Sequence, residues 1–144
     1  SNFHQYFYKN TSVGPIKISG KFTVQDQTEG AILLGTIHLL RALTKMRFGN
    51  DPAAGAPPPV CRLDAYGTHM MKNVPVVVTG WSHELPDNVD YITVAAFKDQ
   101  VGMSMVPVFS TISIDLNVVY SRQEMLNYNV PDWINNKFQG KGYL

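Results

Sequence analysis

Hydrophobic and polar residues alternate along residues 16–25, near the start of the chain. Every second position there is apolar or glycine, from Ile16 to Val24, and each position between is polar. Because successive side chains of a strand point to opposite faces, the alternation predicts a strand with one apolar and one polar face. The polar face carries Lys17, Ser19, Lys21, Thr23 and Gln25.

A helical pattern follows this strand without a linker. After residues 26–29 the period of the apolar positions changes from two to about 3.6. The recurring residues are Ile32, Leu33, Ile37, Leu40, Leu43 and Met46. Thr28 suits the N-cap and Gly49 the C-terminal stop, which predicts one long helix over residues 28–48 that covers the apolar face of the strand. Gly30 and Gly35 each disfavour a helix by about 1 kcal/mol relative to Ala, so we expect close packing on a sheet to stabilise it.

Further strand patterns follow a linker at residues 50–59 that is rich in Asp, Pro, Ala and Gly. They predict strands at residues 60–66, 74–85, 91–97 and 106–120, with a loop at 98–104. The polar side of the last strand carries Thr111, Ser113, Asp115 and Asn117. The fold class expected from these elements is α+β and mainly β, an antiparallel β-barrel or sandwich with one long flanking helix.

The ends of the chain are aromatic and lack a clear period. We expect a single domain over residues 1–144, with extended arms at residues 1–12 and 129–144; a short edge strand is the alternative for the first of these segments. Ser121 followed by Glu124 is a capping-box pattern, which predicts a short helix over residues 121–128. No regular element is predicted after it.

The composition excludes a general electrostatic attraction to nucleic acid or to an acidic membrane. The 144 residues include 12 Lys and Arg and 11 Asp and Glu, for a formal net charge of +1. The longest apolar stretch, residues 31–43, is well short of the roughly 20 residues that a membrane helix needs. Cys61 is the one cysteine, so neither an intrachain disulfide nor a multi-cysteine zinc site is expected.

Motifs for catalysis or for cofactor binding are absent from the sequence. The candidate reactive residues are His38, His69, His83, Glu84, Cys61 and Asp64. His38 is interpreted as a partly buried structural residue, while Cys61 and His69 form the one conceivable thiolate–imidazole pair. His83 and Glu84 are expected on opposite faces of a strand. We therefore predict no enzyme, no catalytic or metal-binding residue and no cofactor.

Four segments together resemble a known family. They are residues 28–49 (TEGAILLGTIHLLRALTKMRFG), 55–61 (GAPPPVC), 73–86 (NVPVVVTGWSHELP) and the strand at 106–120. They resemble the tube-like proteins at the baseplate end of contractile bacteriophage tails, in particular the tail-tube initiator or junction proteins of T4-type baseplates.

The resemblance implies a structural virion protein without enzymatic activity. In that family six copies form a ring, and hairpins from all subunits line a channel through which the genome passes. The implied partners are further copies in a homohexamer, adjacent tail-tube and baseplate hub proteins, the sheath and transiently passing phage DNA, with no membrane. The implied location is the virion, after assembly in the host cytoplasm. The residues implied to face the lumen are Lys17, Lys21, Thr23, Gln25, Thr111, Ser113, Asp115 and Asn117.

Other interpretations of the polar strand faces stay open. An ordinary solvated sheet face fits the pattern as well as a pore lining does. The junction proteins carry additional domains that do not occur in this sequence, which keeps the major tail tube subunit as an alternative. A different class is a monomeric β-sandwich that recognises a glycan or a receptor through the region of Trp81 and Tyr91. We expect Trp81 to be buried in the core instead, because its strand is otherwise apolar.

Overall fold

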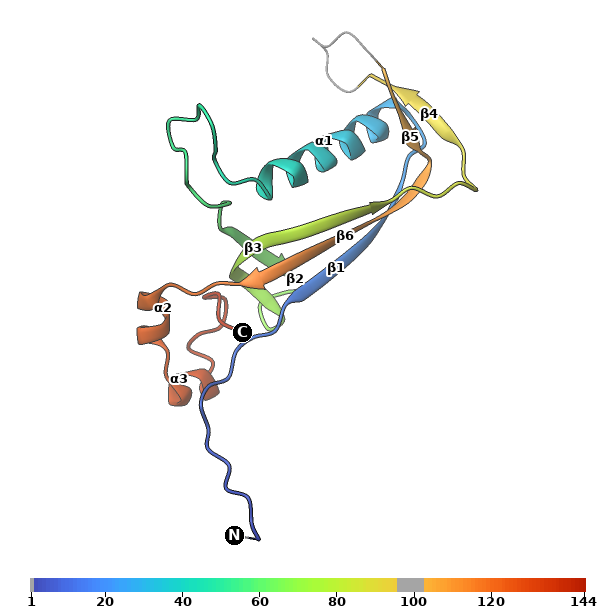
Figure 1. Ribbon diagram of the computed structural model, residues 1–144. Coiled ribbons are helices and arrows are strands. Elements are labelled where there is room, and N and C mark those ends of the chain that lie inside the picture. Colours follow the sequence, from blue (N-terminus) through green and yellow to red (C-terminus); the bar gives the residue numbers. More distant parts are fainter. Residues whose placement is uncertain (1, 96–102) are drawn as a thin grey trace.

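The computed structural model describes residues 2–95 and 103–144 and is mainly β, as predicted (Figure 1). Its main sheet is antiparallel and curls into a half-barrel, with the strand order β1-β6-β3-β2. Its strands are β1 (Ile16–Thr23), β2 (Cys61–Ala65), β3 (Met71–Glu84) and β6 (Phe109–Val118). A separate two-stranded sheet joins β4 (Tyr91–Val94) to β5 (Ser104–Pro107).

The strand predicted over residues 106–120 is divided into β5 and β6. Val108 separates them because its backbone bonds elsewhere: its N–H donates to the Asp90 carbonyl, and its own carbonyl accepts from Val24. Ser104 opens β5, so it is not part of a loop. The rest of the predicted loop at 98–104, and the end of the strand predicted at 91–97, lie mainly outside the described residues.

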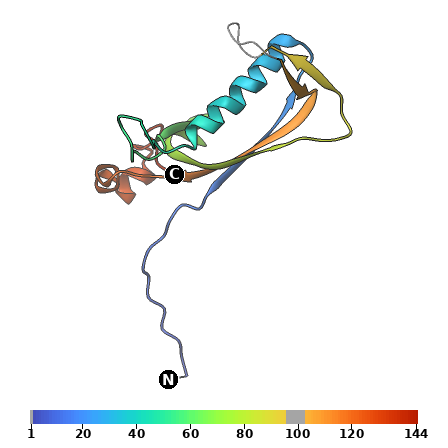
Figure 2. The same ribbon diagram turned by 45° about the horizontal axis from the view of Figure 1, so that its top comes forward.

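Helix α1 (Gln27–Leu43) lies inside the curl of the sheet (Figures 1 and 2). It has 17 residues, so the prediction of one long helix over residues 28–48 is wrong. The N-cap is Asp26 rather than Thr28, and its Oδ1 accepts a hydrogen bond from the Glu29 N–H. The helix ends early because the backbone of Arg47 pairs with residues 55 and 56 of the following loop. Gly49 lies in that loop with φ +71°.

Two apolar clusters hold α1 and the sheet together. In the first, Leu33, Ile37 and Leu40 of α1 are buried, and the other buried members are Val24, Val94, Val106 and Ile112. Trp81 is partly buried against this cluster, which agrees with its expected core position. The second cluster consists of Val74, Val76, Val78 and Leu116. The predicted apolar side of β1 is divided, since Phe22 packs in the first cluster, Ile16 in the second, and Ile18 is 37% exposed.

The C-terminal residues form a packed module, not the extended arm predicted for residues 129–144. Helix α2 (Arg122–Asn127) has the predicted capping box, and α3 (Val130–Ile134) follows it. Asn129 caps α3 by accepting from the Asp132 N–H, a signal that sequence reasoning overlooked. Five aromatic rings contact one another in this module: Tyr120, Tyr128, Trp133, Phe138 and Tyr143.

The N-terminal residues, unlike the C-terminal ones, do not form a packed module. Every residue from 2 to 15 is exposed, and none belongs to a helix or strand. Figures 1 and 2 both show this segment leaving the sheet and extending away from the rest of the molecule. We call residues 2–13 the N-terminal arm.

Candidate functional site

The candidate site is the polar face of the main sheet, on the side opposite α1. It is formed by alternate residues of three adjacent strands, β1, β6 and β3. Both neighbouring pairs of these strands are antiparallel. The intervening residues of the same strands, such as Phe22 and Ile112, pack in the core with α1. The fold therefore separates the two faces as the alternation of the sequence requires.

Cross-strand pairing arranges this face in rows. In the central row, Ser19 of β1 pairs with Ser113 of β6, and Ser113 pairs with Ser82 of β3. The hydroxyl groups of Ser19 and Ser113 are hydrogen-bonded at 2.9 Å. Three small hydroxyl side chains thus form a neutral band across the middle of the face.

Charged residues flank the serine row on both sides. On one side Lys17 pairs with Asp115, and Gly80 of β3 stands beside Asp115. On the other side Thr111 lies between Lys21 and Glu84. The face thus carries two lysines and two carboxylates, so its formal charge sums to zero.

Apolar residues lie at both ends of the face: Val77 of β3 pairs with Asn117 at one end, and Phe109 lies at the other. Thr23 pairs there with Phe109, which is partly exposed, and Lys21 Nζ lies 5.9 Å from the centroid of the Phe109 ring. A single aromatic ring provides no series of stacking platforms for the bases of a single-stranded nucleic acid. The arrangement is therefore hydrophilic and charge-balanced, without a built anion site.

Seven of the eight predicted lumen residues lie on this face. Lys17, Lys21 and Thr23 come from β1, and the others from β6 are Thr111, Ser113, Asp115 and Asn117. Gln25 lies beyond the end of β1, where its backbone N–H donates to Glu29 Oε2. That the face lines a lumen remains a prediction.

Sequence reasoning missed the contribution of β3, namely Ser82 and Glu84. A bulge between Val78 and Gly80 inserts Thr79, whose hydroxyl donates to the Asp115 carbonyl. The extra residue shifts the alternation of inward and outward side chains by one position. The polar positions after residue 79 are therefore out of phase with the apolar run of residues 76–78, and the sequence does not show one continuous alternation. The signal that could have placed Ser82 and Glu84 on the polar face was their alternation with Trp81 and His83.

The candidate reactive residues do not form a catalytic group in the described part of the chain. Cys61 packs against the second apolar cluster, whereas the His69 Nε2 is hydrogen-bonded to the Gln139 side chain at 2.9 Å. His83 and Glu84 lie on opposite faces, as expected, because they pair with Ile112 and Thr111. His38 is exposed on α1, so its interpretation as a partly buried residue is wrong.

Within residues 2–95 and 103–144, no cluster of three His, Cys, Asp or Glu side chains is placed to hold a metal ion. No helix of those same residues has the length and apolar character to cross a bilayer.

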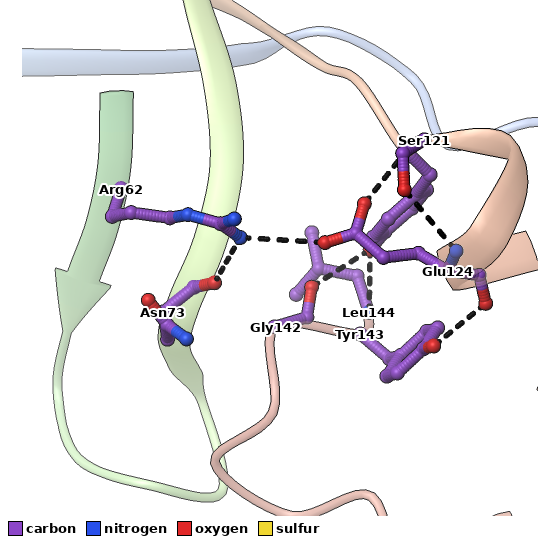
Figure 3. Close-up of polar contacts among 8 residues, drawn as sticks. Arg62, Asn73, Ser121, Glu124, Gly142, Tyr143 and Leu144 are labelled. Atoms are coloured by element: carbon purple, nitrogen blue, oxygen red, sulfur yellow. Dashed lines mark hydrogen bonds and ion pairs between the residues drawn. The ribbon is translucent and has the colours of Figure 1, made fainter. Parts of the chain in front are cut away.

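A second polar cluster joins the C-terminal module to the sheet (Figure 3). Arg62 Nη1 of β2 lies 3.6 Å from Glu124 Oε1 and also donates to the Asn73 carbonyl. The Ser121 N–H donates to the Glu124 carboxylate, which holds the pKa of Glu124 below its ordinary value.

The chain terminus completes this cluster. The Tyr120 hydroxyl donates to the Gly142 carbonyl and accepts from the Leu144 N–H, and the Tyr143 hydroxyl donates to the Glu124 carbonyl (Figure 3). These donors and acceptors satisfy one another, so the cluster has a structural role in fixing the C-terminus. An adjacent cavity of about 300 Å³ includes His69, Trp133 and Gln139 in its wall.

Comparison of the chain with protein-family models, with curated proteins and with solved structures finds no match.

Proposed function

We propose that this chain is a structural subunit of a ring at the junction between the baseplate and the tail tube of a contractile bacteriophage, and that the polar face lines the channel. The observation that carries the proposal is an open, curled sheet with a hydrophilic, charge-balanced face opposite the side that packs on α1. The resemblance of the sequence to tail-tube initiator proteins supplies the hexameric stoichiometry and the location in the virion.

The sheet has two edges at which neighbours can bind. Among the described residues, the eight residues of β1 pair only with β6, and the five residues of β2 pair only with β3. Unpaired strand edges expose backbone N–H and C=O groups that favour association with another chain. The two edges differ, so a contact that joins β1 of one copy to β2 of the next is heterologous. Repeated contacts of this kind generate a closed ring when the rotation between neighbouring copies divides a full turn evenly.

The composition of the polar face suits DNA that must pass without being held. Each phosphate that a fixed lysine neutralises adds affinity by releasing counterions, and this would slow passage. On this face each lysine has a carboxylate in the same or the adjoining strands: Asp115 beside Lys17, and Glu84 across Thr111 from Lys21. The hydroxyl row between them offers hydrogen bonds without charge.

The proposed subunit has no enzymatic role and needs no cofactor. Its partners are further copies of itself, the adjoining tube and hub proteins, and the sheath, in a particle that assembles in the host cytoplasm. A repeating tube subunit is the alternative. Electron microscopy of the assembled particle separates the two, since a junction protein forms one layer and a tube subunit repeats along the axis.

The lumen is tested by labelling single cysteines in the assembled ring. In a Cys61→Ala background, Ser113→Cys places a thiol on the polar face, and Ala53→Cys places a matched thiol on the exposed loop after α1. We expect a small maleimide to label both, and a maleimide carrying a large polymer to label Ala53→Cys alone. In the dissociated chain both reagents should label both sites.

Two results would contradict the proposal. Equal labelling of both thiols by the large reagent in the assembled state would show that the polar face is open to solvent. A strict monomer at high concentration that binds glycans would favour the recognition module instead. Light scattering and negative-stain microscopy determine which state is present.

A further inference from the structure

The N-terminal arm presents aromatic side chains that its own domain does not cover. Tyr6 is 92% exposed, Phe7 80% and Tyr8 81%, and the backbone around them forms no helix or strand. Burying an aromatic side chain removes on the order of 150–250 Å² of surface from water, so three adjacent exposed rings favour docking on another surface.

The charge of the arm restricts what it can bind. Residues 2–25, which contain the arm and β1, include Lys9, Lys17 and Lys21 and no Asp or Glu. The outward side of α1 also exposes apolar residues, but its last turns carry Arg41 and the loop after it carries Lys45 and Arg47. Like charges at that surface disfavour the arm.

One exposed apolar surface of the molecule has the opposite charge. Residues 73–95 include Glu84, Asp87 and Asp90 and no Lys or Arg, and Lys21 of β1 is the lysine that lies against Phe109, 5.9 Å from its ring centroid. These acids lie where β3 ends and the chain turns toward β4, and we call residues 84–91 together with Phe109 the acidic end. Leu85 is 61% exposed and Phe109 38% exposed within it.

The acidic end also contains a pocket. Its volume is about 180 Å³, and its lining consists of Glu84, Pro86, Asn88, Val89, Phe109, Ser110 and Thr111. The Tyr91 hydroxyl donates to the Pro86 carbonyl at 2.7 Å, which fixes the turn that forms one wall. A pocket of mixed polarity, with the Glu84 carboxylate in its lining and Asp87 and Asp90 on the same turn, complements an aromatic segment that carries lysine.

The arm and the acidic end lie at opposite ends of the sheet. β1 and β3 run in the same direction, because both are antiparallel to β6. The arm precedes the first residue of β1, and the acidic end follows the last residues of β3 (Figure 1). A contact between them in the observed conformation therefore joins two copies head to tail.

We propose that the N-terminal arm of one copy docks on the acidic end of a second copy, with its aromatic rings on Leu85 and Phe109 and Lys9 beside the carboxylates. The inference rests on the proposed function in that both require copies of this chain to associate. The contact runs along the strand direction, whereas the contacts that close the ring are made at the sheet edges. The docking therefore joins copies in successive layers, and of the two assemblies under the proposed function it requires the repeating tube subunit.

A cross-link between single-cysteine copies tests the geometry. Two full-length chains, both with Cys61→Ala, carry Phe7→Cys and Leu85→Cys respectively, and are mixed under mild oxidation. We expect a disulfide-linked heterodimer. The matched control replaces Leu85→Cys with Leu39→Cys, an exposed apolar position on α1, for which we expect loss of that product. Equal yields with both partners, or none with Leu85→Cys, would overturn the docking.

Charge exchange tests the same contact in an independent way. Lys9→Glu or Asp87→Lys alone should raise the dissociation constant for self-association by about fivefold, as measured by sedimentation velocity. The two substitutions combined in one chain should restore the original dissociation constant. Failure of the combined variant to restore association would count against the docking. If microscopy shows rings but neither the cross-link nor the charge exchange gives the expected result, only the docking is wrong. If the cross-link forms and microscopy shows no ring, the proposed ring is wrong and the docking stands.

Discussion

A Cβ atom at Gly30 would lie 2.5 Å from Cγ2 of Val94. Gly30 is in the first turn of α1 and Val94 ends β4, so this contact fixes the distance between the helix and the small sheet. The Gln27 side chain reinforces it by donating to the Thr93 carbonyl. We therefore expect Gly30→Ala to destabilise the fold by about 1–3 kcal/mol, although Ala is the better helix former.

Gly35 provides the matched control in the same helix. Nothing lies within 4 Å of a Cβ at that position, so Gly35→Ala should stabilise the fold by up to about 1 kcal/mol. Urea denaturation measures both changes. In a Val94→Ala background, Gly30→Ala should cost less than in the natural sequence. An equal cost in both backgrounds would show that this contact is not the cause.

Gly142 should be the least replaceable residue of the C-terminal module. Its φ is +94°, and a Cβ would collide with the Asn73 backbone carbonyl oxygen. Gly49 has φ +71° with nothing within 4 Å, so Gly49→Ala isolates the conformational strain, about 1–2 kcal/mol. We expect Gly142→Ala to cost more than Gly49→Ala and to expose the C-terminus to proteases. Equal losses of unfolding free energy would contradict the close packing.

Local periodicity made the sheet largely predictable from the sequence. The alternation in β1 and β6 follows from burial of one face, and it correctly placed seven of the eight named polar residues on the opposite face. The class of the fold followed from the same pattern. The position of β5 did not, because the break at Val108 depends on hydrogen bonds to Asp90 and Val24, residues remote in the sequence.

The features that were predicted wrongly depend on tertiary contacts, which local periodicity does not show. The apolar period of α1 continues to Met46, but the loop backbone pairs with Arg47 and ends the helix at Leu43. The C-terminal tail shows no period because its order comes from aromatic contacts, such as Phe138 with Tyr143, rather than from an amphipathic element. Polar residues of β3 were missed because the bulge at Thr79 interrupts their alternation.

His83 should make the stability of the fold depend on pH. Burial lowers its pKa from the ordinary value of 6.5, and its Nε2 is buried without a hydrogen-bond partner among the described residues. The unfolded chain therefore binds the proton more readily. The stabilising contribution is fully present above pH 6.5 and is lost as the pH falls through the lower folded pKa.

The measurement compares the natural sequence with His83→Leu between about pH 5 and pH 7. We expect chemical denaturation to show a smaller loss of unfolding free energy on acidification in His83→Leu. His69→Leu serves as the control, because His69 is exposed and lies outside the apolar core. The same pH dependence in all three proteins would contradict a role for His83.

The charge balance of the polar face should determine whether the protein binds DNA. Glu84→Gln together with Asp115→Asn leaves Lys17 and Lys21 without opposing charges on that face. We expect the double variant to gain an affinity for DNA that falls as salt is raised, because phosphate contacts then release counterions without compensation. Fluorescence anisotropy with labelled DNA measures the gain. Asp87→Asn with Asp90→Asn makes the same change in net charge beyond the end of β3, and should gain far less. If both double variants bind DNA equally, net charge rather than the arrangement of this face governs the interaction.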